Sequence, residues 1–429
     1  MNILLKMRKV IDPLIPKAIS NKWKEYRIKR FQAHYPKVIN RIKNKEKITV
    51  SFFLIHSSVW KYDKLFQLML ADDRFDPVVV ICPYIDYGEE NMIRDLKLSE
   101  EFVRSKGYPY IMTLNFETGK WFDVKQKINP DIVFFTNPHK LTKDEYYIDH
   151  YTESLNCYAP YNFGNSHLLE MFHNQMFHNL LWRLFAETDI HKQFSIDVAL
   201  NKGQNVVTSG FPGTDIFLDK NYFPKDPWKK SKKKLKRIIW APHHTIDDDI
   251  STLSFSSFLV YADFILELTH KYEGFVQFAF KPHPLLKPKL YLHPDWGQEK
   301  TDNYYNLWEN LENGQLEESD YEDLFLTSDA MIHDSGSFLI EYLYLNKPVL
   351  RTDKDDSITD RLNKFGIMAY NMHYHARTKE DIETFVKRVI EEDDEMKESR
   401  EQFIQKYLLP PNNQFASNNI FDEIKKYLE

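Results

Sequence analysis

The chain has 429 residues, of which 42% are hydrophobic and 28% charged, with 31 Phe and 25 Tyr but only 12 Gly. This composition supports a packed core and excludes disordered, collagen-like and linker-like chains, and the length predicts two to three domains. Two cysteines, Cys82 and Cys157, cannot form a disulfide framework, which favours a reducing compartment. The chain has no long apolar run, and Asp12, Pro13 and Pro16 interrupt the early apolar stretch. We therefore expect neither a membrane-spanning helix nor a signal peptide.

The net charge of −6 is unevenly distributed. Residues 1–47 contain 14 Lys and Arg against three acidic residues, a net charge of +11, which leaves −17 for the rest. Apolar side chains lie among these charges, and Trp23 and Tyr26 follow. Such a segment can lie on an anionic membrane surface, pack as a solvated helix on the body, or contact nucleic acid. Because the acidic remainder would repel phosphates, we expect no nucleic-acid partner.

After this segment, short apolar runs alternate with helical patterns, which is typical of parallel sheets with helical crossovers. In the first half, the predicted buried strands are residues 48–56, 77–82, 110–114, 131–136, 155–160 and 206–209. The predicted helices are residues 61–70, 91–106 and a stretch around 178–185.

Residues 219–236 interrupt the alternation with two prolines and a lysine-rich run, which predicts an interdomain linker. Beyond them, strands are predicted at 237–241, 275–280, 330–333 and 348–350, and helices at 255–272, 321–327 and 337–345. The predicted organisation is a basic segment (1–47), an N-terminal α/β domain (48–218), the linker and a C-terminal α/β domain (237–429). We predict two Rossmann-like domains that face a central cleft, with ligands at the carboxyl ends of their strands.

The most specific motif is Asp334-Ser335-Gly336-Ser337, between a predicted strand and a predicted helix. Main-chain N–H groups at a helix start and the serine hydroxyls can bind an anion, and Gly336 allows close approach of the backbone. An ordinary helix cap is the alternative. Glu341 follows one turn later and would either accept from a ribose hydroxyl or remain a solvated charge.

Two further strand ends carry basic side chains. Lys281 and His283 flank a proline and suit a phosphate, and His283 is also a candidate proton shuttle. His243 and His244 can bind phosphate or metal, but adjacent residues rarely chelate one ion together, so we expect no metal there. The acidic residues 247–249 either hold Mg²⁺ or charge a helix N-terminus.

Strand ends of the first half provide candidates for the acceptor side. His56 follows the first strand, and the loops 136–139 and 159–164 follow two others. These loops can form an acceptor pocket with His56 as base, or His56 is a buried structural residue. Gly210 and Pro212 make a tight turn that is either a hinge or part of the ligand site.

Together these segments resemble the CDP-glycerol glycerophosphotransferase family of teichoic-acid and capsule biosynthesis. The second half carries the resemblance over about residues 200–355, through segments 210–215, 240–245, 281–284, 328–337 and 346–349. The first half resembles the shorter, capsule-cluster branch through segments 56–60, 129–138 and 158–163. The resemblance implies a GT-B-type fold, a nucleotide held by the C-terminal domain, and transfer of glycerol phosphate from CDP-glycerol to a hydroxyl with release of CMP.

The sequence departs from the family at two places. Polymerising members carry Trp-His-Gly-Thr-Pro, whose His is thought to be the base, near the point where this chain has Tyr-Ala-Pro-Tyr-Asn-Phe-Gly at 158–164. Members also often have Asp-Tyr-Ser-Ser in place of Asp-Ser-Gly-Ser at 334–337. Because of the first departure, the resemblance assigns no residue as the base and does not imply long-chain polymerisation. The second departure keeps the small polar residues of the phosphate loop.

The predicted function is transfer of a polyol phosphate, with CDP-glycerol or a related CDP-polyol as donor and a lipid-linked saccharide as acceptor, in the cytoplasm at the inner face of the bacterial membrane. The predicted catalytic residues are His56 and His283. The predicted donor-binding residues are Gly210, Pro212, His243, His244, Lys281, His283, Asp334, Ser335, Gly336, Ser337 and Glu341. No cofactor is required by the sequence, and Mg²⁺ stays open. The alternatives are a GT-B glycosyltransferase or UDP-sugar 2-epimerase, and a non-enzymatic membrane scaffold.

Overall fold

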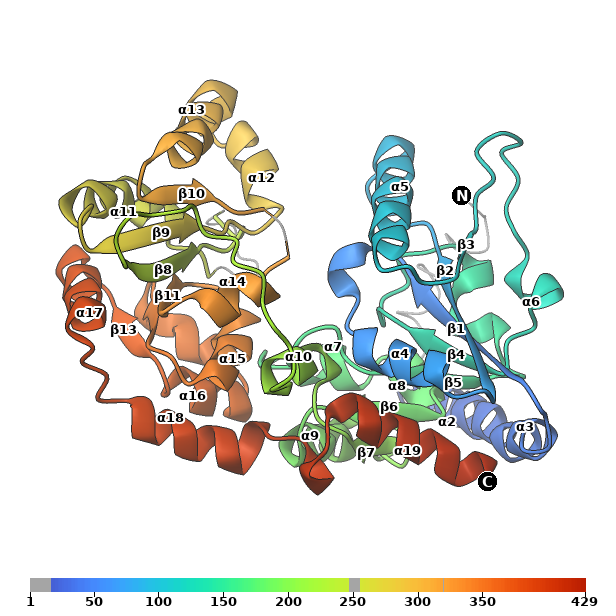
Figure 1. Cartoon of the computed structure of the whole chain (residues 1–429). Helices are drawn as coiled ribbons and strands as arrows, with labels where there is room; N and C mark the ends of the chain where they lie inside the picture. Colours follow the sequence, from blue (N-terminus) through green and yellow to red (C-terminus); the bar gives the residue numbers. More distant parts are fainter. Residues whose placement is uncertain (1–16, 247–254, 319) are drawn as a thin grey trace. The chain divides into compact units, whose positions relative to one another are not determined.

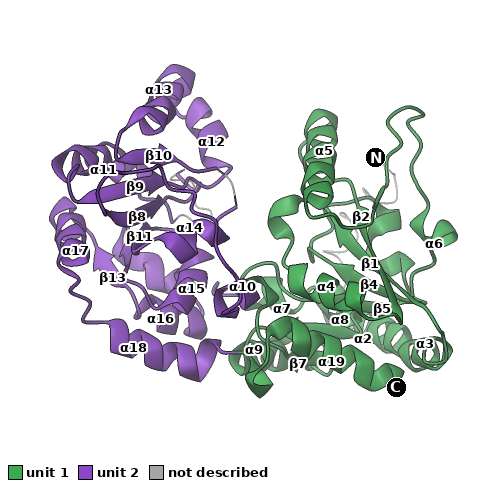
Figure 2. Cartoon of the chain, in the orientation of Figure 1, with its two compact units in different colours: residues 1–162, 169–213, 410–429 green, residues 163–168, 214–409 purple. Residues whose placement is uncertain are grey.

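The computed structural model describes residues 17–246, 255–318 and 320–429 (Figure 1). The chain forms two compact units (Figure 2). Unit 1 comprises residues 1–162, 169–213 and 410–429, and unit 2 comprises residues 163–168 and 214–409. Two segments named in the sequence analysis lie outside the described residues: the apolar residues before position 17, and the acidic residues 247–249, for which Mg²⁺ binding and a helix N-terminal charge were the alternatives.

Unit 1 is built on a seven-stranded parallel sheet with strand order β3-β2-β1-β4-β5-β6-β7. The strands are β1 (Ile48–Leu54), β2 (Phe75–Ile81), β3 (Tyr110–Met112), β4 (Ile132–Phe135), β5 (Leu155–Tyr158), β6 (Arg183–Ala186) and β7 (Val206–Thr208). The central strands β1 and β4 are apolar and almost wholly buried, as expected where helices cover both faces. Phe52 and Phe134 pair in register and stack with ring centroids 4.8 Å apart, so aromatic packing forms the middle of this core.

The longer helices of unit 1 come from both ends of its sequence. They are α2 (Lys17–Gln32), α3 (Tyr35–Ile42), α4 (Asp63–Ala71), α5 (Glu89–Ser105), α9 (Asp189–Val198) and α19 (Ala416–Leu428), with shorter α6 (Val124–Lys127), α7 (Leu169–His173) and α8 (Met176–Leu180). Ile420 and Ile424 of α19 are fully buried in the unit 1 core. Residues 410–429 therefore belong to unit 1, whereas the predicted boundaries placed them in the C-terminal domain.

Unit 2 is built on a six-stranded parallel sheet with order β10-β9-β8-β11-β12-β13. The strands are β8 (Lys236–Ala241), β9 (Val276–Phe280), β10 (Gly314–Leu316), β11 (Ala330–His333), β12 (Val349–Thr352) and β13 (Tyr374–Ala376). The helices are α10 (Asp215–Leu218), α11 (Phe258–Lys271), α12 (Leu286–Leu292), α13 (Gly297–Asn310), α14 (Glu322–Thr327), α15 (Phe338–Glu341), α16 (Lys364–Tyr370), α17 (Lys379–Glu391) and α18 (Lys397–Phe403). Trp240 stacks on Phe258 and Phe280 in its core.

Two details of the predicted organisation were wrong. Residues 219–236 do not form a free linker, because Trp228 is buried and donates to Thr327 while the main chain of Lys229 donates to Gln315, all within unit 2. The stretch 178–185 is not one helix, because α8 ends at Leu180 and β6 begins three residues later. A short run that is buried on all sides has no periodicity to separate helix from strand.

Both sheets have the same winding. In unit 1 the chain builds β1, β2 and β3 outward and then returns to place β4 beside β1. In unit 2 it builds β8, β9 and β10 and then places β11 beside β8. Each unit therefore has a topological switch point, between β1 and β4 and between β8 and β11, outside which α/β proteins bind ligands. In the part of the chain that is described, no helix has the length and apolar character needed to cross a membrane.

Candidate functional site

Three polar segments meet at the switch point of unit 2. Residues 242–245 follow β8, residues 281–284 follow β9, and residues 334–337 follow β11, and these strands are adjacent in the order β9-β8-β11. Because parallel strands bring their carboxyl ends to one edge, the three predicted donor motifs lie together. The sheet topology thus joins residues that are far apart in the sequence.

The histidines of the first two segments form one cluster. The main chain of His283 donates to the carbonyl of Pro242 at 3.1 Å, which holds the β9 loop against the β8 loop. The ring centroids of His243 and His244 are 4.4 Å apart, and His283 lies 4.2 Å from His244 and 5.1 Å from His243. One nitrogen of each ring lies within 4.8 Å of the others, close enough to surround one small group.

Two of these rings, those of His243 and His283, are held in the neutral form by burial. Burial lowers the pKa of His283 to about 3, and burial together with the neighbouring rings holds the pKa of His243 well below its usual range. The Nδ1 atom of His283 accepts from the main-chain N–H of Leu285 at 3.1 Å, so the neutral ring carries its proton on Nε2. Metal-bound histidines usually donate their second N–H to an oxygen, whereas His283 accepts there. The Nε2–H group of His283 is therefore better suited to an anion than to a cation.

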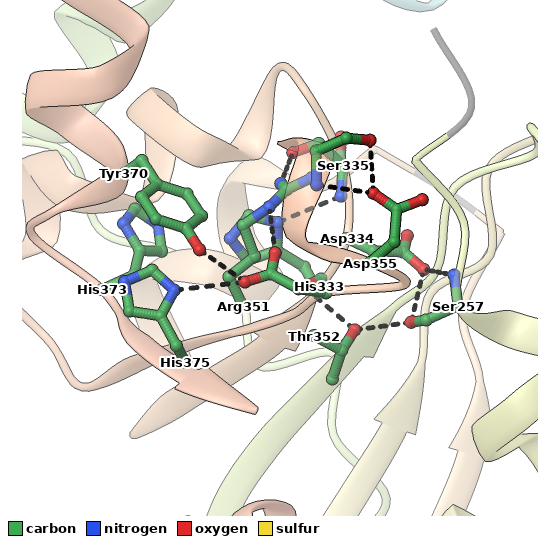
Figure 3. Close-up of polar contacts among 12 residues, drawn as sticks. Ser257, His333, Asp334, Ser335, Arg351, Thr352, Asp355, Tyr370, His373 and His375 are labelled. Atoms are coloured by element: carbon green, nitrogen blue, oxygen red, sulfur yellow. Dashed lines mark hydrogen bonds and ion pairs between the residues drawn. The ribbon is translucent and has the colours of Figure 1, made fainter. Parts of the chain in front are cut away.

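Asp334 ties the serine turn to two other loops (Figure 3). Its carboxylate accepts from the main-chain N–H groups of His243 and Ser257, and from the Ser257 hydroxyl at 3.0 Å. Burial raises its pKa to about 6, against the opposing effect of these hydrogen bonds. We predicted Asp334 as a donor ligand, but its oxygens are used to orient the loops at the ends of β8 and β11.

A buried arginine holds the next residue of the turn. Arg351 of β12 is 1% exposed, and its guanidinium donates to the carbonyl of Ser335 at 2.9 Å and to Asp353 at 3.2 Å (Figure 3). Asp353 also accepts from the Tyr370 hydroxyl at 2.6 Å. The N–H of Ser335 donates to Nδ1 of His333. Both main-chain polar groups of Ser335 are thereby satisfied within the protein.

The next two main-chain N–H groups have no such partner. Among the described residues, nothing accepts from the N–H of Gly336 or Ser337. They precede α15, whose first residue Phe338 instead donates to the Ser335 hydroxyl at 3.5 Å. Two adjacent N–H groups of this kind can bind a phosphate or diphosphate.

Lys281 and Glu341 are buried, and each interacts with other residues of the chain, whereas we predicted that both contact the donor. Lys281 is buried, and burial lowers the pKa of its ammonium against the opposing charges of Glu317 and Asp320. Glu341 is 2% exposed and accepts a hydrogen bond from the Tyr321 hydroxyl. The predicted ribose contact of Glu341 would therefore have to compete with this phenol.

Gly210 and Pro212 belong to unit 1, whereas the other predicted donor residues belong to unit 2. Gly210 has φ of +90°, and a Cβ atom there would lie 2.7 Å from Pro410. This close contact with the segment before α19 explains why the residue is a glycine, without any contact to a ligand.

His56 lies at the carboxyl end of β1, at the switch point of unit 1. Its Nδ1 atom accepts from the main-chain N–H of Ser58 at 3.2 Å and lies 2.8 Å from the Ser58 hydroxyl. Burial lowers its pKa, and Asp95 opposes this shift. The neutral ring then has its proton on Nε2, so the lone pair that a general base needs is directed at the main chain. This geometry favours His56 as a hydrogen-bond donor over the predicted base.

The other loops of the predicted acceptor pocket follow β4 and β5, which come next to β1 in the sheet. In the loop after β4, Asn137 accepts from the N–H of His139, whose ring contacts Gln175 at 3.0 Å. Of the loop after β5, residues 159–162 belong to unit 1, but residues 163 and 164 begin the segment that belongs to unit 2. Residues 163 and 164 of the predicted pocket are therefore described with unit 2.

The comparisons with known proteins show the family of the chain. The family model "CDP-Glycerol:Poly(glycerophosphate) glycerophosphotransferase" matches residues 189–426, which is more than half of the chain. The chain belongs to this family. It is therefore a transferase with a CDP-glycerol donor and a saccharide or polymer acceptor, as predicted. A comparison with curated protein sequences gave no match.

Solved structures support the fold. The wall teichoic acid polymerase TagF is similar with 14% identity and a TM-score of 0.59, over 96% of this chain and 98% of that chain. A putative UDP-N-acetylglucosamine 2-epimerase from Listeria monocytogenes has 16% identity and a TM-score of 0.57, over 89% and 97%. The UDP-GlcNAc 2-epimerase from Neisseria meningitidis, bound to UDP-GlcNAc, has 15% identity and a TM-score of 0.56, over 88% and 99%. The prediction of two Rossmann-like α/β domains of the GT-B type is confirmed.

Three residues of the site were missed from the sequence. Arg351 had a signal, because a charged residue in an apolar strand needs a buried partner. Ser257 and Asn165 had none, since their partners Asp334 and Gly336 are 77 and 171 positions away.

Proposed function

We propose that unit 2 holds the diphosphate of CDP-glycerol at its switch point, between the histidine cluster and the turn 335–337. The observation that carries this proposal is the cluster of His243, His244 and His283, together with the hydrogen bond from the main-chain N–H of His243 to Asp334, the residue that precedes the turn 335–337. These are preorganised donors in a partly buried site, where hydrogen bonds to an anion are strong.

The transfer then proceeds by substitution at phosphorus. The acceptor oxygen bonds to the phosphorus that carries glycerol, the bond from that phosphorus to the bridging oxygen breaks, and CMP leaves with the bond's electron pair. The hydroxyl proton of the acceptor passes to water. His283 donates its Nε2–H toward the leaving oxygen, and the N–H groups of Gly336 and Ser337 stabilise the transferred phosphoryl group. In reactions of this kind, positioning and charge stabilisation account for most of the rate.

On the acceptor side, His56 would donate Nε2–H to the acceptor or to a phosphoryl oxygen. It could take the acceptor's proton only after its ring exchanged tautomers, because Ser58 holds Nδ1. We therefore propose His56 as an acceptor-orienting residue, which differs from the base that its position suggested.

The test of this function is release of CMP. The purified full chain is incubated with lipid-linked saccharides and either CDP-glycerol, CDP-ribitol or UDP-N-acetylglucosamine, and free CMP or UDP is measured. We expect acceptor-dependent release of CMP, reduced about 100-fold or more in His283→Ala and unchanged in His270→Ala, an exposed histidine of α11. Conversion or turnover of the UDP-sugar alone would overturn the proposal in favour of an epimerase or glycosyltransferase.

We also propose that α2 holds the protein on an anionic membrane surface, where a lipid-linked acceptor resides. Ile28 and Phe31 on one side of α2 are buried in unit 1, whereas Trp23 is 59% exposed and Tyr26 is 64% exposed. Lysines and arginines flank these two aromatic side chains along the helix. Exposed aromatics among basic residues suit the interface of an anionic leaflet.

Vesicle sedimentation tests this attachment. We expect the full chain to sediment with vesicles that contain phosphatidylglycerol and to remain in solution with phosphatidylcholine vesicles. The double variant Trp23→Ser, Tyr26→Ser should weaken sedimentation, whereas the same change at exposed Tyr87 and Phe116 of unit 1 should not. Equal binding to both kinds of vesicle would contradict the electrostatic part of the proposal.

A further inference from the structure

A short segment from the first half of the sequence is part of unit 2. The chain enters unit 2 at Phe163 and leaves it after Leu168, long before the rest of unit 2 begins at Thr214. Phe163 stacks on Phe365 of α16 with ring centroids 6.0 Å apart and planes 9° from parallel. Ser166 pairs with Leu362 in an isolated antiparallel bridge. The segment 163–168 is therefore packed into unit 2.

Asn363 anchors the backbone of this segment. Its main-chain N–H donates to the carbonyl of Asn165 at 2.8 Å, and its side-chain amide donates to the carbonyl of Gly164 at 2.6 Å. Its Oδ1 atom caps α16 by accepting from the N–H of Gly366. A Cβ atom on Gly366 would lie only 2.6 Å from the Asn165 carbonyl, so the two backbones are in close contact. Asn165 is thus held at a fixed place on unit 2.

The side chain of Asn165 reaches the serine turn. It is 8% exposed, and its Nδ2 atom donates to the carbonyl of Gly336 at 2.5 Å. Arg351 donates to the preceding carbonyl, that of Ser335. Two consecutive carbonyl groups of the turn are therefore each held by a buried donor from another part of unit 2.

These contacts determine where the next N–H groups point. A peptide group is planar and trans, so its C=O and N–H bonds point in opposite directions. Holding the Ser335 carbonyl directs the N–H of Gly336, and holding the Gly336 carbonyl directs the N–H of Ser337. Without these donors either peptide could flip and present a carbonyl oxygen to an anion, which would repel it.

We propose that Asn165 is a positioning residue that keeps the Gly336–Ser337 peptide turned so that its N–H faces the donor diphosphate. This inference rests on the proposed donor site. It assigns to the segment after β5 a role in donor binding, in addition to any part that the preceding residues play on the acceptor side. The amide is suited to this role because it donates without charge, whereas a carboxylate of the same shape would repel both the Gly336 carbonyl and the anion.

Steady-state kinetics with CDP-glycerol and a fixed acceptor test the proposal in the full chain. Asn165→Asp keeps the shape and loses the donor, and we expect the KM for CDP-glycerol to rise about tenfold or more with the KM for the acceptor unchanged. Asn165→Gln retains the amide and should recover part of the donor affinity. Asn303→Asp, at an exposed position of α13, is the matched control and should behave as wild type.

A second variant tests the same contact without changing Asn165. Gly366→Ala places a methyl group against the Asn165 carbonyl and should also raise the donor KM, whereas Gly274→Ala, with open space at its Cβ position, should not. Unchanged donor KM in both Asn165→Asp and Gly366→Ala, with unfolding midpoints as in wild type, would overturn the inference. If Ser335→Ala weakens CDP-glycerol binding in that case, the donor site stands and only the role of Asn165 fails. If wild type does not bind CDP-glycerol at all, the proposed function fails.

Discussion

The two units share one winding and differ in what surrounds the switch point. In unit 2, the loops after β8, β9 and β11 bring together three histidines and two N–H groups that have no acceptor in the described chain. In unit 1, the loops after β1 and β4 satisfy themselves locally: His56 accepts from Ser58, and Asn137 accepts from His139. The same architecture thus carries a cluster of three histidines at one switch point and a single turn-bound histidine at the other, so the two switch points differ in their loops and not in their fold.

One buried charge network from each unit can be compared, and the two lie at opposite ends of their sheets. Arg351 and Asp353 lie at the carboxyl end of β12, beside the serine turn. In unit 1, Asp131 immediately precedes β4 at the amino end, where it accepts from Lys45 at 2.7 Å and from Thr49 at 3.1 Å. The charge network of unit 2 holds the serine turn, whereas that of Asp131 in unit 1 joins the amino ends of β1 and β4.

The largest expected effect comes from breaking the charge network of unit 2. Arg351→Met leaves the Asp353 carboxylate buried without its guanidinium and releases the Ser335 carbonyl. We expect the free energy of unfolding of unit 2 to fall by about 3–5 kcal/mol. Chemical denaturation followed by tryptophan fluorescence measures this change.

The matched variant in unit 1 is Lys45→Met. Lys45 is partly exposed, and Asp131 keeps its contacts with Arg41 and Thr49, so the loss should be about 1 kcal/mol or less. Equal losses in the two variants would show that the two charge networks do not differ in the way described.

Gly210→Ala tests the packing role assigned to this glycine in unit 1. The new Cβ atom would meet Pro410, and the positive φ adds backbone strain, so we expect a loss of about 1–3 kcal/mol in the free energy of unfolding. Binding of CDP-glycerol to the folded variant should be unchanged. A folded variant with full stability but weaker donor binding would contradict the packing role and would support the predicted role of Gly210 in donor binding.

Acid should destabilise the protein through its buried neutral histidines. Burial holds the pKa of His333 well below its usual range. Below about pH 6.5, the unfolded chain binds a proton that the folded chain does not, so stability falls as the pH falls, by about 1.4 kcal/mol per pH unit for each such histidine.

The variant His333→Asn removes one of these titrating groups and so measures its share of the pH dependence. Its Oδ1 atom can take the place of Nδ1 in accepting from Ser335, but it does not titrate. We expect urea denaturation at about pH 7 and about pH 5.5 to show a smaller pH dependence than wild type. His270→Asn, at an exposed position, should retain the wild-type dependence, and the same dependence in His333→Asn would contradict this account.

The smallest expected effect is that of His56→Gln. Glutamine can still donate a hydrogen bond where Nε2–H of His56 does, but it cannot act as a base. If His56 orients the acceptor, kcat should fall by only a few-fold, whereas loss of a general base would cost about 100-fold or more. The pH profile of kcat should also keep its shape in this variant.

Much of the fold could be predicted because buried parallel strands are apolar runs of a characteristic length. The predicted strand at 48–56 corresponds to β1, and the run at 330–333 coincides with β11. Where this signal fails, as at 178–185, the residues are buried in both helix and strand, so burial does not distinguish the two. The sequence of α19 does not indicate that this helix belongs to unit 1, because that depends on the distant core residues against which Ile420 packs.

The sequence could predict which motifs belong to the candidate site, but not the role of each side chain in them. The residues at the ends of β8, β9 and β11 were identified because polar residues after an apolar strand stand out. Which side chains contact a ligand and which orient the loops depends on tertiary partners: Asp334 accepts from Ser257, and Glu341 accepts from Tyr321. The tautomers of His56 and His283 likewise depend on a main-chain N–H two residues later, which is a matter of turn geometry.

Isothermal titration calorimetry with CDP-glycerol tests the central claim most directly. The full chain is titrated as wild type, as the double variant His283→Ala, Ser335→Ala in unit 2, and as the double variant His56→Ala, Asn137→Ala in unit 1. The account predicts that the unit 2 variant loses at least about tenfold in affinity, while the unit 1 variant binds as wild type does. Unchanged affinity in the unit 2 variant together with a loss in the unit 1 variant would contradict it.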